Sequence, residues 1–339
     1  MEIREFDLIA RLVEMVDRAR LESGGDSASP ARIEIGTGDD AAVTVPPGAT
    51  VTTVDALIEG VHFRRDTAPL RSIGAKALAT ALSDLAAMGA RPGEAYVQLG
   101  IPDDLDEEAC LELGEGLARV AAEYRVAVIG GDVSRAPVLM IATTAVGHAR
   151  SPGDLVSRSG AHPGDRIAVT GALGGAAAGL LLLEGPGRGA EVDPAVAEAL
   201  RRSQLEPIPR LGAGRALAGA GATAMIDVSD GLGADAGHVA AASRVRLMIE
   251  LAALPVEDGV ERVARAAGLD PLDLASGAGE DYELLVTLPA EDLDAAREAV
   301  AASGGALTDI GVVEEGFGVA LREPDGSERT PRGFDQLRG

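Results

Sequence analysis

The sequence is poor in cysteine, in aromatic residues and in lysine. Its 339 residues include one cysteine, Cys110, four histidines and no tryptophan, and only 2% are aromatic. A single cysteine excludes a disulfide within the chain, and so few Cys and His residues exclude a Cys/His zinc cluster. The one lysine, Lys76, stands in Gly74-Ala75-Lys76-Ala77 and not in a Gly-x-x-x-x-Gly-Lys-Ser/Thr stretch, so a P-loop is excluded.

Basic residues are also scarce relative to acidic ones. The chain has 54 Asp and Glu against 30 Lys and Arg, which gives a net charge of −24. A surface of this sign repels polyanions, so nucleic acids and anionic membranes are excluded as partners. No apolar run approaches about 18 residues and no leader pattern opens the chain, so a cytoplasmic protein is predicted.

The length predicts two domains, and both halves mix strands with helices, which indicates an α+β architecture in each. Helices are predicted over 5–18, 72–88, 105–123, 174–184, 195–203, 209–219, 232–242, 258–267 and 291–303. Strands are predicted near 32–36, 41–45, 50–55, 59–63, 94–100, 126–130, 137–147, 166–170, 223–228, 245–251, 283–288, 306–313 and 317–322. A Pro/Gly-rich connector over 149–164 predicts domains of 1–148 and 149–339.

Six aspartates stand among apolar residues and glycines: Asp40, Asp55, Asp84, Asp132, Asp227 and Asp230. Most are interpreted as strand ends, and Asp84 as part of an apolar helix. Two carboxylates 4 Å apart repel by about 4 kcal/mol at an effective dielectric of 20, which a bound cation relieves. A turn or cap explains any single Asp-Gly pair, but the set favours a site for Mg²⁺ or Mn²⁺, and hence for a nucleoside triphosphate.

Other candidate phosphate contacts leave alternatives open. Gly36-x-Gly38 precedes a strand instead of a helix, which excludes a dinucleotide-binding turn. Gly171-x-x-Gly174-Gly175 suits either an anion site or a close-packed turn, and Arg158 either a phosphate contact or a linker residue. His62 alone is more typical of a structural histidine, and Cys110 of helix packing.

Eight motifs, taken in order, resemble the thiamine-monophosphate kinase family. They are Glu5-Phe6-Asp7-Leu8-Ile9-Ala10-Arg11, Gly38-Asp39-Asp40-Ala41, Asp55 with Glu59-Gly60-Val61-His62-Phe63, Leu82-Ser83-Asp84-Leu85-Ala86-Ala87-Met88-Gly89-Ala90, Gly130-Gly131-Asp132, Ser157-Arg158-Ser159-Gly160-Ala161, Ile226-Asp227-Val228-Ser229-Asp230-Gly231-Leu232 and Gly279-Glu280-Asp281-Tyr282-Glu283-Leu284. The resemblance implies a mixed α/β, two-domain fold like that of aminoimidazole ribonucleotide synthetase, with an N-terminal domain that dimerises through its sheet. It also implies transfer of phosphate from ATP to thiamine monophosphate, with several Mg²⁺ ions.

The resemblance also assigns roles by position. The implied magnesium ligands are Asp40, Thr53, Val54 through its carbonyl, Asp55, Asp84, Asp132, Asp227 and Asp230. The implied nucleotide contacts are Tyr124, Gly131, Asp132, Arg158 and Ser229, and the implied contacts with thiamine monophosphate are His62, Glu280 and Phe334. The chain departs from the family pattern at Val54, where Thr is common, and at Ala278, where Gly is usual.

Because thiamine monophosphate brings its own anionic nucleophile, we expect direct in-line transfer with no separate catalytic residue, and Asp55 and Asp132 as the most critical ligands. The alternatives are a selenophosphate synthetase-like enzyme and a non-catalytic nucleotide sensor. The first needs a reactive cysteine near the N-terminus, which this chain lacks.

Overall fold

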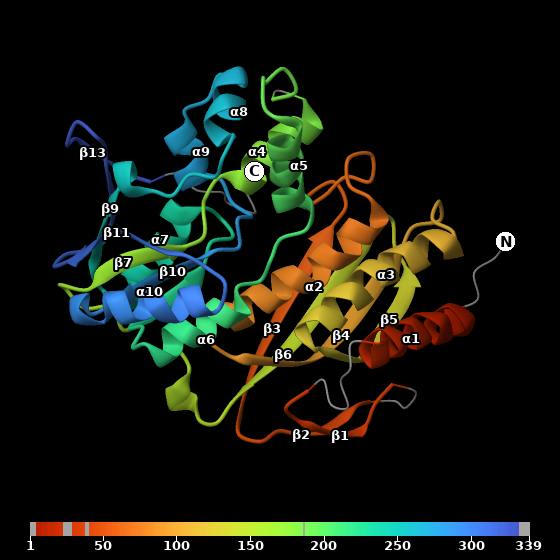
Figure 1. Ribbon diagram of the computed structural model, residues 1–339. Helices are drawn as coiled ribbons and strands as arrows, with labels where there is room; N and C mark the ends of the chain where they lie inside the picture. The colour runs from red at the N-terminus through yellow and green to blue at the C-terminus, as the bar shows by residue number, and fades with distance from the viewer. Residues whose placement is uncertain (1–4, 23–28, 38–40, 186, 332–339) are drawn as a thin grey trace. The chain divides into compact units, whose positions relative to one another are not determined.

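The computed structural model describes residues 5–22, 29–37, 41–185 and 187–331 (Figure 1). The chain folds into two compact units, which we call the N-terminal unit (1–85 and 90–152) and the C-terminal unit (86–89 and 153–339). Within the described ranges, no helix combines the length and the apolar character that crossing a bilayer requires.

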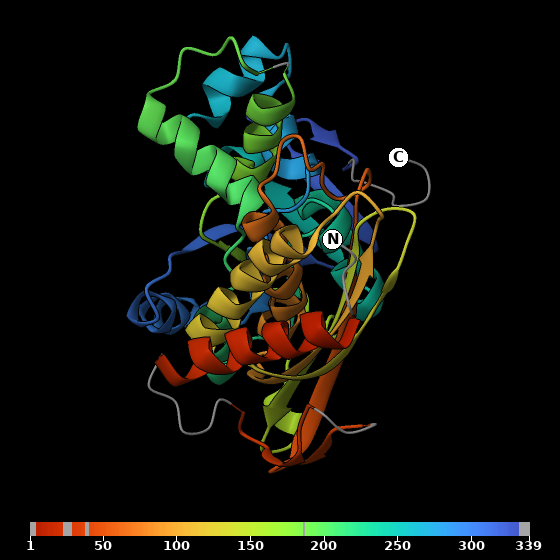
Figure 2. The same ribbon diagram turned by 90° about the vertical axis from the view of Figure 1, so that its right-hand side faces the viewer.

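The N-terminal unit is built on a four-stranded sheet. Its strands are β3 (Ala49–Ile58), β4 (Arg91–Ile101), β5 (Ala127–Arg135) and β6 (Met140–Ala149), in the order β3-β6-β4-β5. All pairs are antiparallel except β4 with β5. A separate hairpin pairs β1 (Arg32–Ile35) with β2 (Val43–Val45). Figures 1 and 2 show α2 (Leu70–Ala87) and α3 (Glu107–Tyr124) along one face of the sheet, with α1 (Glu5–Glu22) beside α3.

Small residues let α2 and α3 approach to backbone contact. A Cβ at Gly116 would lie 1.8 Å from the carbonyl oxygen of Arg71, and one at Gly74 would lie 1.9 Å from that of Leu113. Any larger side chain at either position would push the two helices apart. The alanine-rich sequence of α2, in which Leu78, Leu82 and other apolar residues are fully buried, is therefore a requirement of close packing.

A buried contact between a histidine and a glutamate joins two strands of this sheet. His148 Nε2 on β6 lies 2.7 Å from Glu94 Oε2 on β4, and both side chains are almost fully buried. The second oxygen of Glu94 accepts a hydrogen bond from Ser29 Oγ at 2.8 Å. This cluster therefore ties the segment before β1 to the sheet.

The C-terminal unit is built on a seven-stranded sheet of order β13-β12-β9-β11-β7-β10-β8. Its strands are β7 (Arg166–Thr170), β8 (Ala224–Asp227), β9 (Arg246–Glu250), β10 (Leu284–Leu288), β11 (Leu307–Glu314), β12 (Gly318–Arg322) and β13 (Glu328–Arg329). Its helices are α4 (Gly175–Glu184), α5 (Pro194–Leu205), α6 (Leu211–Gly219), α7 (Leu232–Ser243), α8 (Val260–Ala266), α9 (Pro271–Gly277) and α10 (Leu293–Ala302). The core gathers buried aliphatic residues of the central strands and α7, among them Val169, Ile226, Leu247, Leu285 and Val239.

The predicted two-domain mixed α/β fold is confirmed, with local corrections. The strand predicted over 50–55 is longer and forms β3, from Ala49 to Ile58. The strand predicted over 59–63 is wrong, because these residues form a turn closed by an isolated bridge between Glu59 and Phe63. β5 continues to Arg135 and does not end at 130, because Asp132 pairs with Gln98 inside the ladder. The strand-end interpretation is therefore wrong for Asp55 and Asp132, which lie within β3 and β5.

Helix α9 was not predicted. Asp270 caps it by accepting hydrogen bonds from the backbone N–H groups of Leu272 and Asp273, and Pro271 occupies its first position. Asp followed by Pro is a recognised start signal, but the helix spans only seven residues, too few for a clear apolar period.

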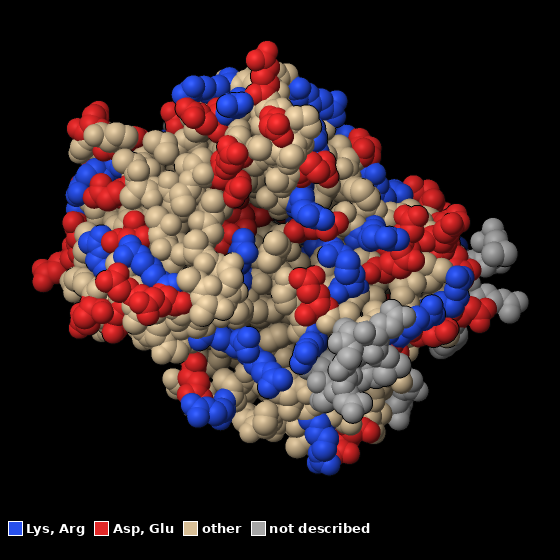
Figure 3. Space-filling view, in the orientation of Figure 1, with Lys and Arg blue, Asp and Glu red and all other residues tan. Residues whose placement is uncertain are grey.

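Acidic and basic side chains are interspersed on the face of the molecule in view in Figure 3. Several arginines are held in ion pairs, for example Arg322 with Glu250 at 2.6 Å and Arg166 with Asp309 at 2.8 Å. The acidic side chains in view therefore do not form a single uniform patch on this face.

Candidate active site

In the N-terminal unit, β3 and α2 bring two predicted magnesium ligands into contact. Thr53 Oγ1 donates a hydrogen bond to Asp84 Oδ2. Asp55 follows two residues after Thr53 on the same face of β3, and its Oδ1 accepts from the backbone N–H of Ala56 at 2.7 Å. Val54 points to the opposite face and is 67% exposed, so its departure from Thr leaves the backbone carbonyl unchanged. The unit therefore groups Thr53, Asp55 and Asp84.

Asp132 lies on the other edge of the same sheet. Across the four strands, Asp55 pairs with Thr143, Thr143 with Val97, and Val97 with Gly131. Asp132 therefore lies in the next row of paired residues. β3 and β5 are the two edge strands of this sheet. Three strand spacings separate them, roughly 14 Å measured along the sheet. Within one N-terminal unit the two most critical predicted ligands are therefore kept apart.

An apolar pocket lies beside the predicted nucleotide contacts Gly131 and Asp132. It has a volume of about 110 Å³ and is lined by residues of α1, α3, β4 and β5, including Val16 and Leu117. Tyr124, the third predicted nucleotide contact of this unit, is the last residue of α3 and is half-buried. Arg125 ends the helix in the left-handed conformation, with φ 56°.

His62 lies in the turn after β3, and its ring orientation is fixed. Its Nδ1 accepts a hydrogen bond from the backbone N–H of Ile58 at 3.1 Å. Nε2 is therefore the ring nitrogen that can donate to a bound molecule. Arg65 holds the turn by donating from Nε to Glu59 Oε1 at 2.6 Å and from Nη2 to Asp104 Oδ2 at 2.9 Å.

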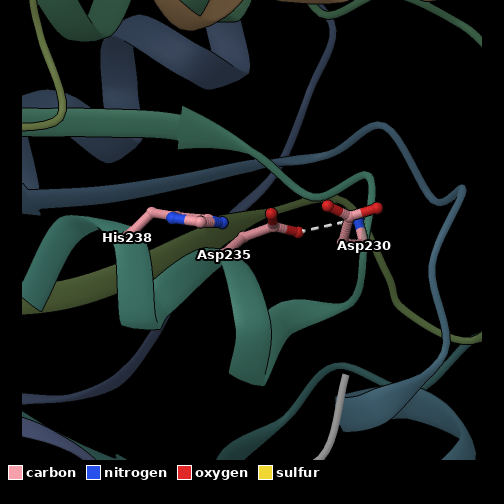
Figure 4. A group of neighbouring side chains, drawn as sticks. All are labelled: Asp230, Asp235 and His238. Atoms are coloured by element: carbon pink, nitrogen blue, oxygen red, sulfur yellow. Dashed lines mark hydrogen bonds between the residues drawn. The ribbon is translucent and has the colours of Figure 1, made fainter. Parts of the chain in front are cut away.

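In the C-terminal unit, the predicted ligands Asp227 and Asp230 flank a turn between β8 and α7. The turn is held by Asp235, a buried residue of α7 that sequence analysis did not single out (Figure 4). Asp235 Oδ2 accepts hydrogen bonds from the backbone N–H groups of Ser229 and Asp230, each at 3.0 Å. Burial, reinforced by the charge of Asp227, raises the pKa of Asp235 to about 7. Because its backbone N–H is engaged by Asp235, Ser229 would contact a nucleotide through its hydroxyl group.

A second turn, Gly279 to Tyr282, carries the predicted substrate contact Glu280. It pairs with the first turn, because Glu280 N donates to Ser229 O at 2.9 Å and Tyr282 N donates to Val228 O at 2.9 Å. A Cβ at Gly279 would lie 2.1 Å from Ser229 O, so only glycine allows this approach. Ala278 has φ −89° and ψ 150°, an extended conformation that alanine adopts freely, so its departure from Gly is accommodated.

The Gly-rich turn before α4 is not open to an anion. Asp281 accepts hydrogen bonds from the backbone N–H groups of Gly174 at 2.8 Å and Ala176 at 3.3 Å. Burial raises the pKa of Asp281 to about 7, although these two hydrogen bonds act in the opposite direction. Of the two interpretations left open for Gly171 to Gly175, the structure supports the close-packed turn.

Arg158, the predicted phosphate contact of this unit, is exposed, and its carbonyl oxygen accepts a hydrogen bond from Ser243 Oγ at 3.2 Å. Asp40 and Phe334 lie outside the described residues. Cys110 is buried in α3, and burial raises the pKa of its thiol to about 11. This agrees with the packing role predicted for Cys110, since a protonated buried thiol is a poor nucleophile.

The donor atoms suit a hard divalent cation. Thr53, Asp55 and Asp84 offer only oxygen, as do Asp227 and Asp230, which is the preference of Mg²⁺. Among the described residues, Asp230, Asp235 and His238 bring one ligand atom each within 4.8 Å of one another (Figure 4). Asp235 is engaged by the turn and His238 offers nitrogen, so Asp230 is the member suited to magnesium.

Known proteins are similar to this chain along most of its length. Residues 38–149 match the family AIR synthase related protein, N-terminal domain, and residues 162–323 match its C-terminal domain. Thiamine-monophosphate kinase of Escherichia coli (strain K12) is 38% identical over 313 residues, which are 92% of this chain and 90% of that protein.

Two solved structures are similar in fold as well as in sequence. The crystal structure of thiamine-monophosphate kinase from Stenotrophomonas maltophilia K279a has a TM-score of 0.81 and 36% identity, covering 94% of this chain and 97% of that one. AaThiL complexed with AMPPCP and TMP has a TM-score of 0.75 and 31% identity, covering 94% of each chain. With both family domains matched in order and these identities across most of its length, the chain belongs to the thiamine-monophosphate kinase family of AIR synthase related proteins.

Proposed function

We propose that this protein transfers the γ-phosphate of ATP to thiamine monophosphate and forms thiamine diphosphate and ADP. The relatives named above support the reaction. The observation that carries the proposal is the hydrogen bond between Glu280 N and Ser229 O, because it joins a predicted substrate contact to a predicted nucleotide contact. A kinase requires these two kinds of contact to be adjacent.

The proposed magnesium ligands are oxygen donors from both units: Asp40, Thr53, the carbonyl of Val54, Asp55, Asp84, Asp132, Asp227 and Asp230. When bound, magnesium neutralises charge on the phosphate oxygens and lowers the repulsion between two anionic substrates. Thr53 orients Asp84 through its hydroxyl group, and Asp235 holds the turn that carries Asp230. The carboxylates are thereby fixed before any substrate arrives.

The remaining proposed residues bind the two substrates. Tyr124, Gly131, Asp132, Arg158 and Ser229 contact ATP, and His62, Glu280 and Phe334 contact thiamine monophosphate. His62 donates from Nε2 to an acceptor atom, since Ile58 occupies Nδ1. An oxygen of the monophosphate forms the new bond to the γ-phosphorus while the bond from that phosphorus to the β–γ bridging oxygen breaks, and ADP leaves with the electron pair.

We also propose that two copies associate through the four-stranded sheets of their N-terminal domains. In one copy, Asp55 and Asp132 lie on opposite edge strands. Pairing of β3 in one copy with β5 in a second copy would bring the strand that carries Asp55 next to the strand that carries the partner's Asp132. The domains, predicted as 1–148 and 149–339, would each supply ligands, and a cytoplasmic location fits an enzyme that uses ATP.

The test is incubation with ATP, MgCl₂ and thiamine monophosphate, followed by chromatography for thiamine diphosphate and a coupled assay for ADP. We expect both products only when all three components are present, and none with EDTA. A sensor would bind ATP without releasing ADP, and a selenophosphate synthetase-like enzyme would use selenide in place of thiamine monophosphate; either result would overturn the proposal.

Variants connect the reaction to the residues. Asp55→Asn and Asp132→Asn should each lower kcat by about 10²-fold or more, because each removes a charge that holds a cation. Asp103→Asn is the matched control, since Asp103 is an exposed aspartate of the same unit, 80% accessible at its side chain. Its kinetics should match those of the wild type, and near-normal turnover by Asp55→Asn at saturating magnesium would remove Asp55 from the site.

A further inference from the structure

The carboxylate of Glu280 is held by a residue from a distant helix. Gln204, near the end of α5, donates a hydrogen bond from Nε2 to Glu280 Oε2 at 2.6 Å. The two residues are 76 positions apart in the chain, and the side chain of Gln204 is buried, with 5% exposure. A buried amide aimed at a carboxylate makes a charge-assisted hydrogen bond, which is among the stronger kinds in proteins.

The backbone beneath Glu280 is in a costly conformation. Glu280 has φ 70° and Tyr282 has φ 51°, both in the left-handed region that non-glycine residues seldom adopt. Each such residue costs about 1–3 kcal/mol and persists only where its surroundings hold it. Ser229 holds the backbone of Glu280 from one side, and Gln204 holds its side chain from the other. This turn therefore presents one carboxylate in one direction.

A second glutamate, three residues along the chain, has a structural role. Glu283 is buried and forms an ion pair with Arg210, whose Nη2 lies 2.5 Å from Oε1, and it accepts a further hydrogen bond from Thr170 Oγ1 at 2.6 Å. Glu283 thus faces a cation of the protein itself, as expected for a structural carboxylate. The carboxamide of Gln204 orients Glu280 without adding a positive charge. The thiazolium ring of thiamine monophosphate is a cation, which such a carboxylate attracts.

We infer that Gln204 is a positioning residue for substrate recognition: it fixes the Glu280 carboxylate toward the cationic part of thiamine monophosphate and adds no competing charge. This inference rests on the proposed substrate contact of Glu280. It extends the site to α5, which no motif of the sequence marks.

Three substitutions test it. Gln204→Met keeps the length of the side chain but removes the donor, so the Kd and KM for thiamine monophosphate should rise about tenfold. Its kcat and its KM for ATP should stay within twofold of the wild type. Gln204→Lys keeps a donor but adds a cation, and should weaken binding at least as much. Ser203→Ala is the control on the same helix, since Ser203 Oγ donates only locally, to Ala199 O at 3.1 Å, and it should leave both constants unchanged.

A double variant separates positioning from general packing. If Gln204 acts through Glu280, adding Gln204→Met to Glu280→Gln should weaken binding no further, whereas a structural role would make the two losses multiply. Calorimetric titration with thiamine monophosphate alone and steady-state kinetics should be measured on the same samples. Wild-type protein that neither binds nor phosphorylates this substrate would overturn the proposed function and this inference together. This inference alone would be overturned if the wild type is active but Gln204→Met binds thiamine monophosphate as the wild type does. It would also be overturned if the wild type is active but the losses of binding in the double variant multiply.

Discussion

The contact between the two turns of the C-terminal unit can be broken by one methyl group. A Cβ at residue 279 would lie 2.1 Å from the carbonyl oxygen of Ser229 and 3.0 Å from its carbonyl carbon. Ordinary carbon–oxygen contacts are about 3.3 Å or longer, so Gly279→Ala must move the two turns apart by roughly 1 Å. Gly279 is not in the left-handed region, so the effect comes from the added atom and not from its φ.

The displacement acts on the proposed reaction geometry. The hydrogen bond from Glu280 N to Ser229 O is 2.9 Å long, and a shift of roughly 1 Å takes it beyond bonding distance. Glu280 then moves relative to the residues proposed to bind the nucleotide. A misplacement of about 1 Å can cost about 10²-fold in rate, so we expect kcat/KM for thiamine monophosphate to fall by about that factor.

The assay is steady-state formation of thiamine diphosphate, with a thermal melt of each protein. Gly237→Ala is the matched control, because Gly237 lies in the neighbouring helix α7 and an added Cβ there meets no atom within 4 Å. This control should keep normal kinetics and gain about 0.5–1 kcal/mol, since alanine is the better helix residue. Gly279→Ala with kcat and both KM values within twofold of the wild type would refute the reasoning, as would an equal loss of activity in Gly237→Ala.

Three further predictions concern other parts of the molecule. Because burial raises the pKa of Asp281 to about 7, the folded protein keeps a proton that the unfolded chain releases near pH 4. The difference in free energy of unfolding between the wild type and Asp281→Asn should therefore fall as the pH rises from about 4 to about 7, and then stay constant. Urea titrations in the presence of EDTA measure it, and a difference that does not change with pH would contradict the prediction. Glu94→Leu should lower the free energy of unfolding by about 2 kcal/mol, because it leaves the buried His148 ring without its 2.7 Å hydrogen-bond partner, and a loss below about 0.5 kcal/mol would show that this contact is not needed. Mixing inactive Asp55→Asn and Asp132→Asn chains after joint refolding should restore about a quarter of wild-type activity, since half of random dimers are mixed and each holds one intact site. Complete absence of activity in the mixture would place both residues in a site made by one copy.

Much of the fold follows from local patterns in the sequence. The apolar run Arg166–Thr170 and the periodic stretch Leu232–Ser243 are where the structure has β7 and α7, because each forms on signals within a few residues. The turn from Asp227 to Gly231 was likewise visible, since a polar cluster follows an apolar strand. These elements depend little on the rest of the chain.

Other features depend on long-range pairing, which local patterns do not report. β5 reads as ending at its two glycines, yet it continues to Arg135 because β4 supplies partners through Ile101. Asp55 likewise lies in mid-strand because β6 pairs with β3 along its whole length, from Ala49 to Ile58. The contact between Gln204 and Glu280 has no local signal at all, since only the packing of α5 brings the glutamine to the turn.

Two carboxylates, Asp235 and Asp281, occupy backbone N–H groups that could otherwise receive phosphate. A helix N-terminus is normally a ready place for phosphate, because its backbone N–H groups have no partners. Here Asp281 takes those groups at the start of α4, and Asp235 takes those of the turn before α7. The single lysine, Lys76, is 3% exposed in α2. Under the proposed function, with these turns closed and the one lysine buried, phosphate charge would be met by arginine and by cations held on Asp side chains. On this proposal, a chain of net charge −24 would bind two phosphate-bearing substrates because a cation bound between carboxylates and phosphate offsets their repulsion.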